Sequence, residues 1–427
     1  MWRELPLGNL ATINSGGTPS TENAEFWGGE IPWVTPTDIT ACKTNYLFDT
    51  ASQITKKGLH SCSAKLLPAG SILFTSRATV GVSRIAGIPV CTNQGFKSLT
   101  SGASADGKFL FYQVQRLRSA FERYAAGSTF PEINKKDTAR VLIPHPADVR
   151  VQQKIATILS TIDTAIEQTE ALIEKYQHIK AGLMHDLFTR GLLPNGQLRP
   201  PREQAPELYQ ETAIGWIPRD WRFTTCEAVC EQIIDCKNRT PPETPDGHPA
   251  IRTPNVRNGE FVDKELLFTD ARSYAIWTAR GKPKVGDVVI TREAPVGEVC
   301  MIPERHPEAC LGQRMMLYRP NEEIIDSNFF LFALQSRQIQ NRLDLISGGS
   351  TVGHVRVGDI RNLWMFMPKS KQEQQQIAGT LSQGSERLRA EQAKRDKLQT
   401  QKLGLMQDLL TGKVAVTVNA RTAEAVA

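Results

Sequence analysis

Apolar side chains between positions 149 and 190 recur at alternating steps of four and three residues, which predicts one long helix. The segment contains no proline and a single glycine, Gly182, whereas prolines flank it on both sides. A seven-residue period is typical of a helix that winds around a partner helix. The positions on this period are Ile155, Leu159, Ile162, Ile166, Thr169, Ile173, Tyr176, Lys180, Leu183 and Leu187.

The framework of this stretch returns near the C-terminus at a constant offset of 222 residues, so the chain is repeated inside. The Gly-Ser-Thr triplet at 127–129 recurs at 349–351, and Asp137 and Pro146 recur as Asp359 and Pro368. A second helix is predicted from 373 to 410, and each helix would extend roughly 55 Å. Its more polar seam is Ile377, Leu381, Gly384, Leu388, Glu391, Arg395, Leu398, Lys402, Leu405 and Leu409. From periodicity alone, the helices could be a plain spacer or could also dock partner proteins.

The residues before each helix mix short strands and helices, which predicts an α+β fold. A buried strand is expected at 71–76, further strands at 82–90 and 95–99, and an amphipathic helix at 109–124. The segment Gly286–Gly297 echoes Gly70–Gly81, although the offset between the two globular halves as a whole drifts between about 216 and 221. Trp27 and Trp33 belong to an aromatic stretch that suits either a packed turn at a sheet edge or a ligand contact. The predicted parts are a globular half 1–146, a helix 147–190, an extended linker 191–220, a second globular half 221–368, a helix 369–412 and a tail 413–427.

Composition adds little to this division. The 427 residues carry a formal net charge of +6, which suits a polyanionic partner without proving one. No apolar run approaches the roughly 18 residues that a bilayer crossing needs, and the first thirteen residues are too polar for a signal peptide. We therefore expect a cytoplasmic protein. Cys226, Cys230 and Cys236 cluster without a zinc-ligand spacing and are expected to be structural thiols.

The motifs of a self-contained DNA enzyme are missing. No glycine-rich cofactor loop and no polar-Pro-Pro-aromatic loop occurs, and the segment 240–243 (TPPE) lacks both flanking groups. The segment 102–109 has P-loop spacing, but Phe109 stands where a hydroxyl must hold magnesium. The histidines show no ligand spacing. His354 has no counterpart in the first copy, and we expect a solvated or packing role for it.

Several passages together resemble the specificity subunit of type I restriction-modification systems. These passages are GGTP at 16–19, FWGGEIPWVTP at 26–36, the two Gly-Ser-Thr segments, QQKIA at 152–156, IGWIPRDW at 214–221, and GLMHDL and GLMQDL starting at 182 and 404. The resemblance covers nearly the whole chain. It implies two target-recognition domains separated by a pair of long antiparallel coiled-coil helices, with an internal pseudo-two-fold repeat.

The resemblance also implies a function. Each domain would read one half of a split DNA sequence, and the helices would set the unread gap. Two modification subunits that carry S-adenosylmethionine and methylate adenine would dock on this chain, and two motor subunits that use ATP and magnesium would cleave DNA. The chain itself would hold no cofactor or metal and would catalyse nothing.

Direct readout needs loop side chains that reach base edges in the grooves of DNA. The candidates in the first domain are Thr18, Ser20, Thr35, Arg77, Asn93, Gln94 and Lys97. The candidates in the second domain are Lys237, Arg239, Arg252, Asn255, Arg292, Gln313 and Arg314. Arg77 and Arg292 are preferred because each is expected in the loop after an echoed strand. They differ by one alignment place, so their equivalence stays open, and a phosphate contact or an ordinary surface charge is the alternative for every candidate.

Two other functions remain open at this point. The chain could be a coiled-coil scaffold that organises protein partners without touching nucleic acid, in which case salt-sensitive binding to duplex DNA would be missing. It could also be a self-contained methyltransferase or nuclease. A failure of the isolated chain to bind cofactor would count against that function.

Overall fold

A computed structural model describes residues 2–125, 131–212, 215–348 and 353–418. It divides into two compact units, one formed by 1–172 with 391–427 and the other by 173–390. Two long helices contribute to both units: α7 (Val149–Thr189) with 41 residues and α13 (Lys371–Leu409) with 39 residues. Both predicted helices are confirmed. Both Gly-Ser-Thr segments lie outside the described residues.

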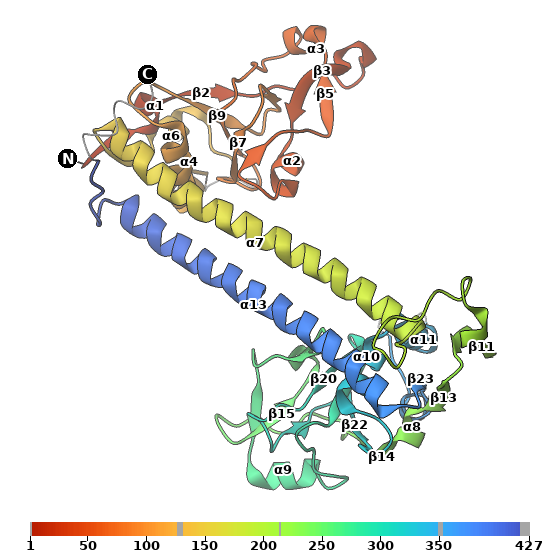
Figure 1. Cartoon of the computed structure of the whole chain (residues 1–427). Helices are drawn as coiled ribbons and strands as arrows, with labels where there is room; N and C mark the ends of the chain where they lie inside the picture. The colour runs from red at the N-terminus through yellow and green to blue at the C-terminus, as the bar shows by residue number, and fades with distance from the viewer. Residues whose placement is uncertain (1, 126–130, 213–214, 349–352, 419–427) are drawn as a thin grey trace. The chain divides into compact units, whose positions relative to one another are not determined.

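Unit 1 contains three sheets and several short helices ahead of α7 (Figure 1). Its strands are β1 (Trp2–Pro6), β2 (Ala11–Ser15), β3 (Trp27–Val34), β4 (Tyr46–Leu47), β5 (Ser52–Ile54), β6 (Ile72–Phe74), β7 (Ser83–Ala86), β8 (Cys91–Thr92), β9 (Lys97–Ser101) and β10 (Leu142–Pro146). Its helices before α7 are α1 (Leu7–Leu10), η1 (Ala24–Phe26), α2 (Pro36–Ala41), α3 (Lys56–His60), α4 (Gly107–Arg116), α5 (Arg118–Ala125) and α6 (Lys135–Arg140). The sheets have the orders β1-β10, β2-β9-β6-β7-β4 and β5-β3-β8.

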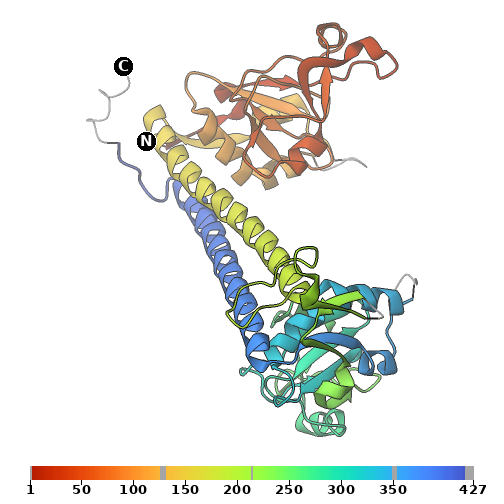
Figure 2. The same cartoon turned by 45° about the vertical axis from the view of Figure 1, so that its right-hand side comes forward.

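Unit 2, which Figure 2 shows in a second view, contains a similar set of elements with the additional strand pairs β11-β12 and β16-β17. Its strands are β11 (Tyr209–Thr212), β12 (Gly215–Pro218), β13 (Trp221–Thr225), β14 (Cys230–Asp235), β15 (His248–Ile251), β16 (Val256–Arg257), β17 (Glu260–Phe261), β18 (Leu267–Thr269), β19 (Val288–Arg292), β20 (Val296–Met301), β21 (Cys310–Leu311), β22 (Met315–Pro320) and β23 (Trp364–Pro368). Its helices before α13 are η2 (Pro206–Leu208), α8 (Cys226–Val229), η3 (Thr253–Asn255), α9 (Ala271–Trp277), α10 (Ser327–Gln335), α11 (Arg337–Ile346) and α12 (Val357–Arg361).

The strand order shows that the sequence repeat is a repeat of topology. The order β2-β9-β6-β7 of unit 1 matches β14-β22-β19-β20 of unit 2, and β5-β3-β8 matches β18-β15-β21. The three-stranded sheets also contain a parallel strand pair at the same place: β3 pairs in parallel with β8, and β15 pairs in parallel with β21. The strand that opens each half pairs with the strand that closes it, with Trp2 opposite Pro146 and Trp221 opposite Pro368.

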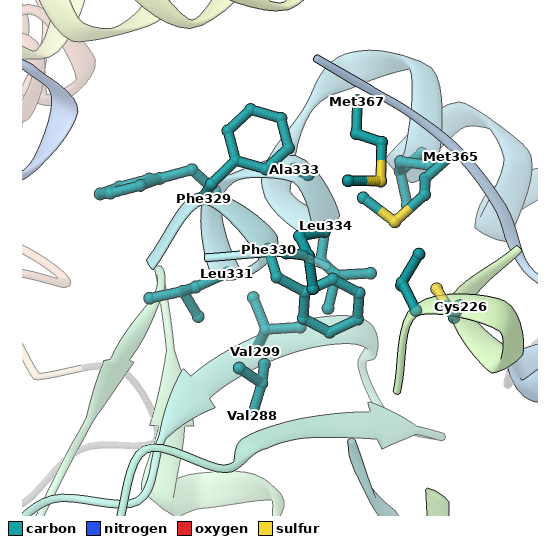
Figure 3. Packing of buried hydrophobic residues seen from close by; sticks show 14 of the residues in the cluster. Cys226, Val288, Val299, Phe329, Phe330, Leu331, Ala333, Leu334, Met365 and Met367 are labelled. Atoms are coloured by element: carbon teal, nitrogen blue, oxygen red, sulfur yellow. The ribbon is translucent and has the colours of Figure 1, made fainter. Parts of the chain in front are cut away.

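Each main sheet buries its apolar side chains under the helices that follow it. In unit 2, Phe330 and Leu334 of α10 pack on Val288 and Val299 of the sheet, and Met365 closes the cluster (Figure 3). In unit 1, Phe74 of β6 contacts Phe121 of α5 with ring centroids 4.7 Å apart. The predicted buried strand at 71–76 is confirmed as β6, whose residues Ile72–Phe74 are all buried.

The predicted helix at 109–124 is wrong in one respect, because it is two helices. The backbone leaves helical geometry at Leu117, between α4 and α5. Phe109 of the first helix and Phe121 of the second are both fully buried in the same core. The hydrophobic pattern alone does not show the break.

The predicted extended linker at 191–220 is also wrong, because it contains the hairpin β11-β12 and a buried anchor. Arg199 is 2% exposed. Its Nη1 donates to Glu373 Oε1 over 2.6 Å and its Nη2 donates to Asp220 Oδ2 over 2.6 Å. Glu373 Oε1 also accepts from the Trp221 indole over 3.0 Å and from the Leu192 amide over 2.8 Å. This segment is therefore tied to the start of α13.

Candidate nucleic-acid interface

The candidate residues of unit 1 gather where β2, β3 and β6 end and where β9 begins. Because β9 is antiparallel to β2 and β6, its first residues lie beside the last residues of both strands. Backbone hydrogen bonds join the loops there: Gly17 N to Thr92 O, Asn93 N to Val34 O, and Ser76 N to Gly95 O, at 2.7–3.0 Å. We call this the reading edge of unit 1.

Polar side chains of this edge hold one another or the backbone. Thr18 donates from its hydroxyl to the Gln94 side chain. Asn93 Oδ1 accepts from the Gly95 amide over 2.9 Å. Thr35 caps α2, with the Asp38 carboxylate accepting from its amide and its hydroxyl. Thr18, Asn93 and Gln94 are thus brought together, while Thr35 is committed to a helix cap.

Two tryptophans position the loop that follows β2. Trp33 donates from its indole to Gly17 O over 3.0 Å, and Trp27 donates to Ser20 O over the same distance. The two rings meet edge to face with centroids 5.0 Å apart. Ser20 is exposed, but its backbone is held by this contact. Of the two interpretations offered for the tryptophans, the packed turn is the one that the structure shows.

Arg77 is exposed on this edge and pairs with Glu132. Its Nε and Nη2 both donate to Glu132 Oε2, over 3.1 and 2.7 Å. Lys97 lies beneath as the first residue of β9 and is 7% exposed. Its ammonium is 3.3 Å from Ser76 Oγ and 3.9 Å from Glu132 Oε1. Burial lowers the pKa of Lys97, with Glu132 opposing and Arg77 adding to the effect.

Unit 2 forms a corresponding reading edge where β14, β15 and β19 end and β22 begins. The same backbone bonds recur there: Gly312 N to Ile251 O and Arg292 N to Arg314 O, each 2.8 Å. The loop after β14 is held by Trp277 of α9, which donates to Arg239 O over 2.9 Å. Lys237 and Arg239 lie over that ring at 5.3 and 5.2 Å from its centroid. Their charged ends are thus fixed beside an aromatic face.

Arg252 and Asn255 form the turn after β15. Asn255 is fully buried, and its amide donates to Val262 O and Lys264 O over 3.0 and 3.1 Å. The prediction that Asn255 lies in an exposed reading loop is therefore wrong. Arg252 occupies the place that Thr35 has in unit 1, since the amide of each donates to the side chain three residues on. Its Nη2 donates to Glu265 O over 2.6 Å.

Arg292 is not in a loop. It is the last residue of β19, and only 9% of it is exposed. The residue that matches it in unit 1 is Ser76, because the carbonyls of Ser76 and Arg292 accept from Ile133 N and Val355 N respectively. The expected placement of Arg292 in a loop is wrong, and its equivalence to Arg77, which the sequence left open, does not hold. The constant offset of 216 over Gly70–Gly81 would have aligned Arg77 with Glu293.

Gln313 and Arg314 precede β22 at the surface of this edge. Arg314 adopts a φ of 72°, and it stands where unit 1 has Gly95. Its Nε lies 3.0 Å from Glu293 Oε2, and His354 Nδ1 lies 2.7 Å from Glu293 Oε1. His354 does have a structural counterpart, which is Glu132. An isolated backbone β-bridge pairs His354 with Glu293, and the same kind of bridge pairs Glu132 with Arg77. Sequence reasoning missed Glu132 and Glu293, although both follow from the constant offsets.

The helix positions of the seven-residue period are all buried or partly buried, whereas Leu403, which lies off the period, is 69% exposed. In unit 1, Ile155 and Leu159 share a core with Met406 and Leu409. In unit 2, Leu187 shares a core with Ile377 and Leu381. The positions at intermediate exposure are Ile162, Tyr176, Lys180, Leu183, Gly384, Leu388, Glu391, Arg395, Leu398, Lys402 and Leu405.

Within unit 1 the two helix segments run in opposite directions. Lys402 Nζ lies 2.6 Å from Asp163 Oδ1, and Gln399 Nε2 lies 3.5 Å from Glu170 Oε1. Asp163 also accepts from the Tyr112 hydroxyl and the Asn45 amide, each over 2.7 Å. This buried carboxylate therefore connects both helix segments to the sheet domain.

Three further features of the described residues concern metal ligands, cysteines and the apolarity of the helices. In 2–125, 131–212, 215–348 and 353–418, no three His, Cys, Asp or Glu side chains are grouped to hold a metal ion. Burial raises the pKa of the Cys226 thiol to about 12 and also raises that of Cys230, so both stay protonated. Among the described helices, none combines the length and apolarity needed to cross a membrane.

Comparison with known proteins identifies the family. The family described as "Type I restriction modification DNA specificity domain" matches residues 1–176 and 220–400. Because this match covers most of the chain and includes both reading edges, the chain belongs to that family.

Individual relatives agree. The "Type I restriction enzyme MjaIX specificity subunit" of Methanocaldococcus jannaschii is 35% identical over 189 residues, which is 44% of this chain and 44% of that protein. The MjaVIII specificity subunit of the same organism is 24% identical over 73% of this chain and 71% of its own length. The crystal structure of the S subunit of a type I restriction-modification system from M. genitalium has the same fold, with a TM-score of 0.59, 16% identity and coverage of 98% and 97%.

Proposed function

We propose that this chain is the DNA-binding specificity subunit of a type I restriction-modification complex, and that it directs adenine methylation or restriction without catalysing either reaction. The observation that carries the proposal is the family match over two units that repeat one topology, each with a reading edge. In this proposal each edge binds one half-site of a split DNA target. A scaffold that avoids nucleic acid would need neither duplicated edge, and the family match does not favour it.

The helices would act as the spacer between the half-sites. The two domains, 1–146 and 221–368, would be held by an antiparallel coiled coil made by 147–190 and 369–412. In support, seam positions are buried in both units and the helix segments of unit 1 run in opposite directions. Two reading heads would then meet DNA about one helical turn apart, roughly 34 Å.

The partners would supply the chemistry. Two modification subunits would bring S-adenosylmethionine, and two restriction subunits would bring ATP and magnesium, in the cytoplasm. In this proposal the DNA-contacting candidates are Thr18, Asn93, Gln94, Arg77, Lys237, Arg239, Gln313 and Arg314. Contacts to phosphate position a protein on DNA, and contacts to base edges give specificity. The exposed members of this set would provide both.

The test is to co-express the chain with the modification subunit of its own locus and to map methylated adenines across the host genome. A split motif with an unread gap is expected. Replacing residues 221–348 with those of another family member should change one half-site and leave the other. Binding of the purified complex to a cognate duplex should weaken steeply with salt. The proposal fails if the complex assembles yet no motif appears and duplex binding is absent or insensitive to salt.

A further inference from the structure

The loops after β6 and β19 share two backbone features at a constant offset of 216. Ala78 and Ala294 both have positive φ, 60° and 44°. A bridge joins Arg77 to Glu132, and the same bridge joins Glu293 to His354. Arg77 and Glu293 are therefore one position of the fold, occupied by opposite charges.

Each reading edge nevertheless contains one arginine paired with one carboxylate. In unit 1 the arginine is Arg77, from the loop after β6, and the carboxylate is Glu132. In unit 2 the carboxylate, Glu293, comes from the equivalent loop, and the arginine is Arg314, from the loop before β22. Both edges therefore contain an arginine–carboxylate pair, but the arginine comes from a different loop in each unit. The two guanidinium groups consequently lie at different places on the two edges.

The hydrogen-bond geometry leaves part of each guanidinium available. Arg77 uses Nε and Nη2 on one carboxylate oxygen, which leaves Nη1 and the second Nη2 hydrogen at the end of the fork. Arg314 faces Glu293 with Nε, and Glu293 is held from its other oxygen by His354. The side chains of Arg77 and Arg314 are 51% and 45% exposed. Lys97 and Arg292, by contrast, are at most 9% exposed.

We infer that Arg77 and Arg314 each read a guanine in the half-site of their own domain, with Glu132 and Glu293 as positioning residues. This inference rests on the proposed function. Guanine presents O6 and N7 as two acceptors in the major groove, and the free end of an arginine fork matches them with two parallel hydrogen bonds. A carboxylate on the other side of the guanidinium fixes the plane of the fork before DNA arrives. Lysine lacks the fork, so it cannot replace arginine here.

The test uses the full chain assembled with its modification subunit and maps methylated motifs for the wild type, Arg77→Lys and Arg314→Lys. We expect a G·C pair in each half-site of the wild-type motif. Arg77→Lys should relax that pair in the first half-site only, and Arg314→Lys should relax the pair in the second only. Discrimination against other bases at that position should fall roughly ten- to a hundredfold.

Matched controls are Arg118→Lys in unit 1 and Arg305→Lys in unit 2. Arg118 pairs with Glu122 and Arg305 pairs with Asp263, and their side chains are 49% and 51% exposed. Arg118 belongs to α5 and Arg305 to the segment between β20 and β21, and neither is part of the loops that form the reading edges, so neither variant should change the motif. Glu132→Gln and Glu293→Gln should weaken discrimination at the same two positions as the arginine variants while thermal unfolding stays unchanged.

The outcomes separate the two ideas. A wild-type assembly that methylates no split motif overturns the proposed function and the inference with it. A split motif that Arg77→Lys and Arg314→Lys leave unchanged overturns the inference alone. A uniform loss of methylation at every position, with base preferences intact, would assign the two arginines to phosphate and would also overturn the inference.

Discussion

The starts of the two long helices are nearly the same structure built twice. Gln152 is fully buried, donates to Pro146 O over 2.9 Å and accepts from the Asp106 amide over 2.8 Å. Gln374 makes the same two bonds, at the same distances, with Pro368 O and the Asp326 amide. Both aspartates then cap the next helix of their unit. Buried backbone groups need partners, so the glutamine that satisfies them is kept in both copies.

The neighbouring positions differ. Glu373 anchors the segment at 191–220, whereas the equivalent residue in unit 1 is Val151. Asp163 pairs with Lys402 in unit 1, whereas in unit 2 the equivalent residues are Ser385 and Lys180, for which the described residues show no ion pair. The two units therefore share the glutamine that hydrogen-bonds to buried backbone groups. They differ in the ion pairs that join each long helix to neighbouring segments.

The largest difference in stability between the two units is predicted for Glu373→Ala. The change removes one of the two carboxylates that pair with buried Arg199 and leaves the Trp221 indole and the Leu192 amide without their acceptor, so it should lower the free energy of unfolding of unit 2 by about 3–5 kcal/mol. Hydrogen exchange of amides, read separately for the two units, measures the loss. The matched change Val151→Ala should cost unit 1 only about 1 kcal/mol. Equal losses in the two units would contradict this asymmetry.

A smaller effect is expected for Asp163→Ala. The variant removes the acceptor of Tyr112 and Asn45 and the partner of Lys402, and should cost unit 1 about 3 kcal/mol. The converse change, Ser385→Asp, should give Lys180 a partner and raise the stability of unit 2 by up to about 1 kcal/mol. Both predictions are tested by unfolding each variant in denaturant and monitoring the two units separately by amide hydrogen exchange. A loss in unit 2 on Ser385→Asp would show that the repeat does not extend to this pair.

The glutamine hydrogen bonds that the two units share provide the control for the predictions on Glu373 and Asp163. Gln152→Ala and Gln374→Ala should each cost about 2 kcal/mol, because each leaves the same buried backbone groups unpaired. The double variant should be additive within about 0.5 kcal/mol, since the two sites share no contact partner. Single losses that differ by more than 1 kcal/mol would mean that the two glutamines are not energetically equivalent.

The smallest effect concerns Lys97, whose equivalent in unit 2 is Met316. Burial lowers the pKa of Lys97, so the folded chain loses this proton before the unfolded chain does. Its contribution is unfavourable at neutral pH and is relieved as the pH rises from the lowered folded pKa toward the ordinary value. Unfolding of the wild type and of Lys97→Met should therefore differ less at pH 10 than at pH 8. A difference that grows with pH would contradict the sign.

Particular residues show which features of the structure could be predicted from the sequence. The seam from Ile155 to Leu187 was readable because a helix is built from bonds between near neighbours, so its buried face appears directly as a period in the sequence. The break at Leu117 was not readable, because apolar residues continue through it. Arg199 could not be assigned, since its partner Glu373 lies 174 residues away.

The same distinction applies at the reading edges. The sequence by itself determined the repeat, the two long helices and the loops of the candidates other than Lys97, Asn255 and Arg292, since these depend on local period and on constant offset. Only the tertiary structure decided that Arg292 and Asn255 are buried and that Arg314 pairs with the Glu293 carboxylate. Those pairings join residues that are distant along the chain through the register of paired strands. The pleat then determines which side chain faces the surface, and a shift of one residue exchanges an exposed arginine for a buried one.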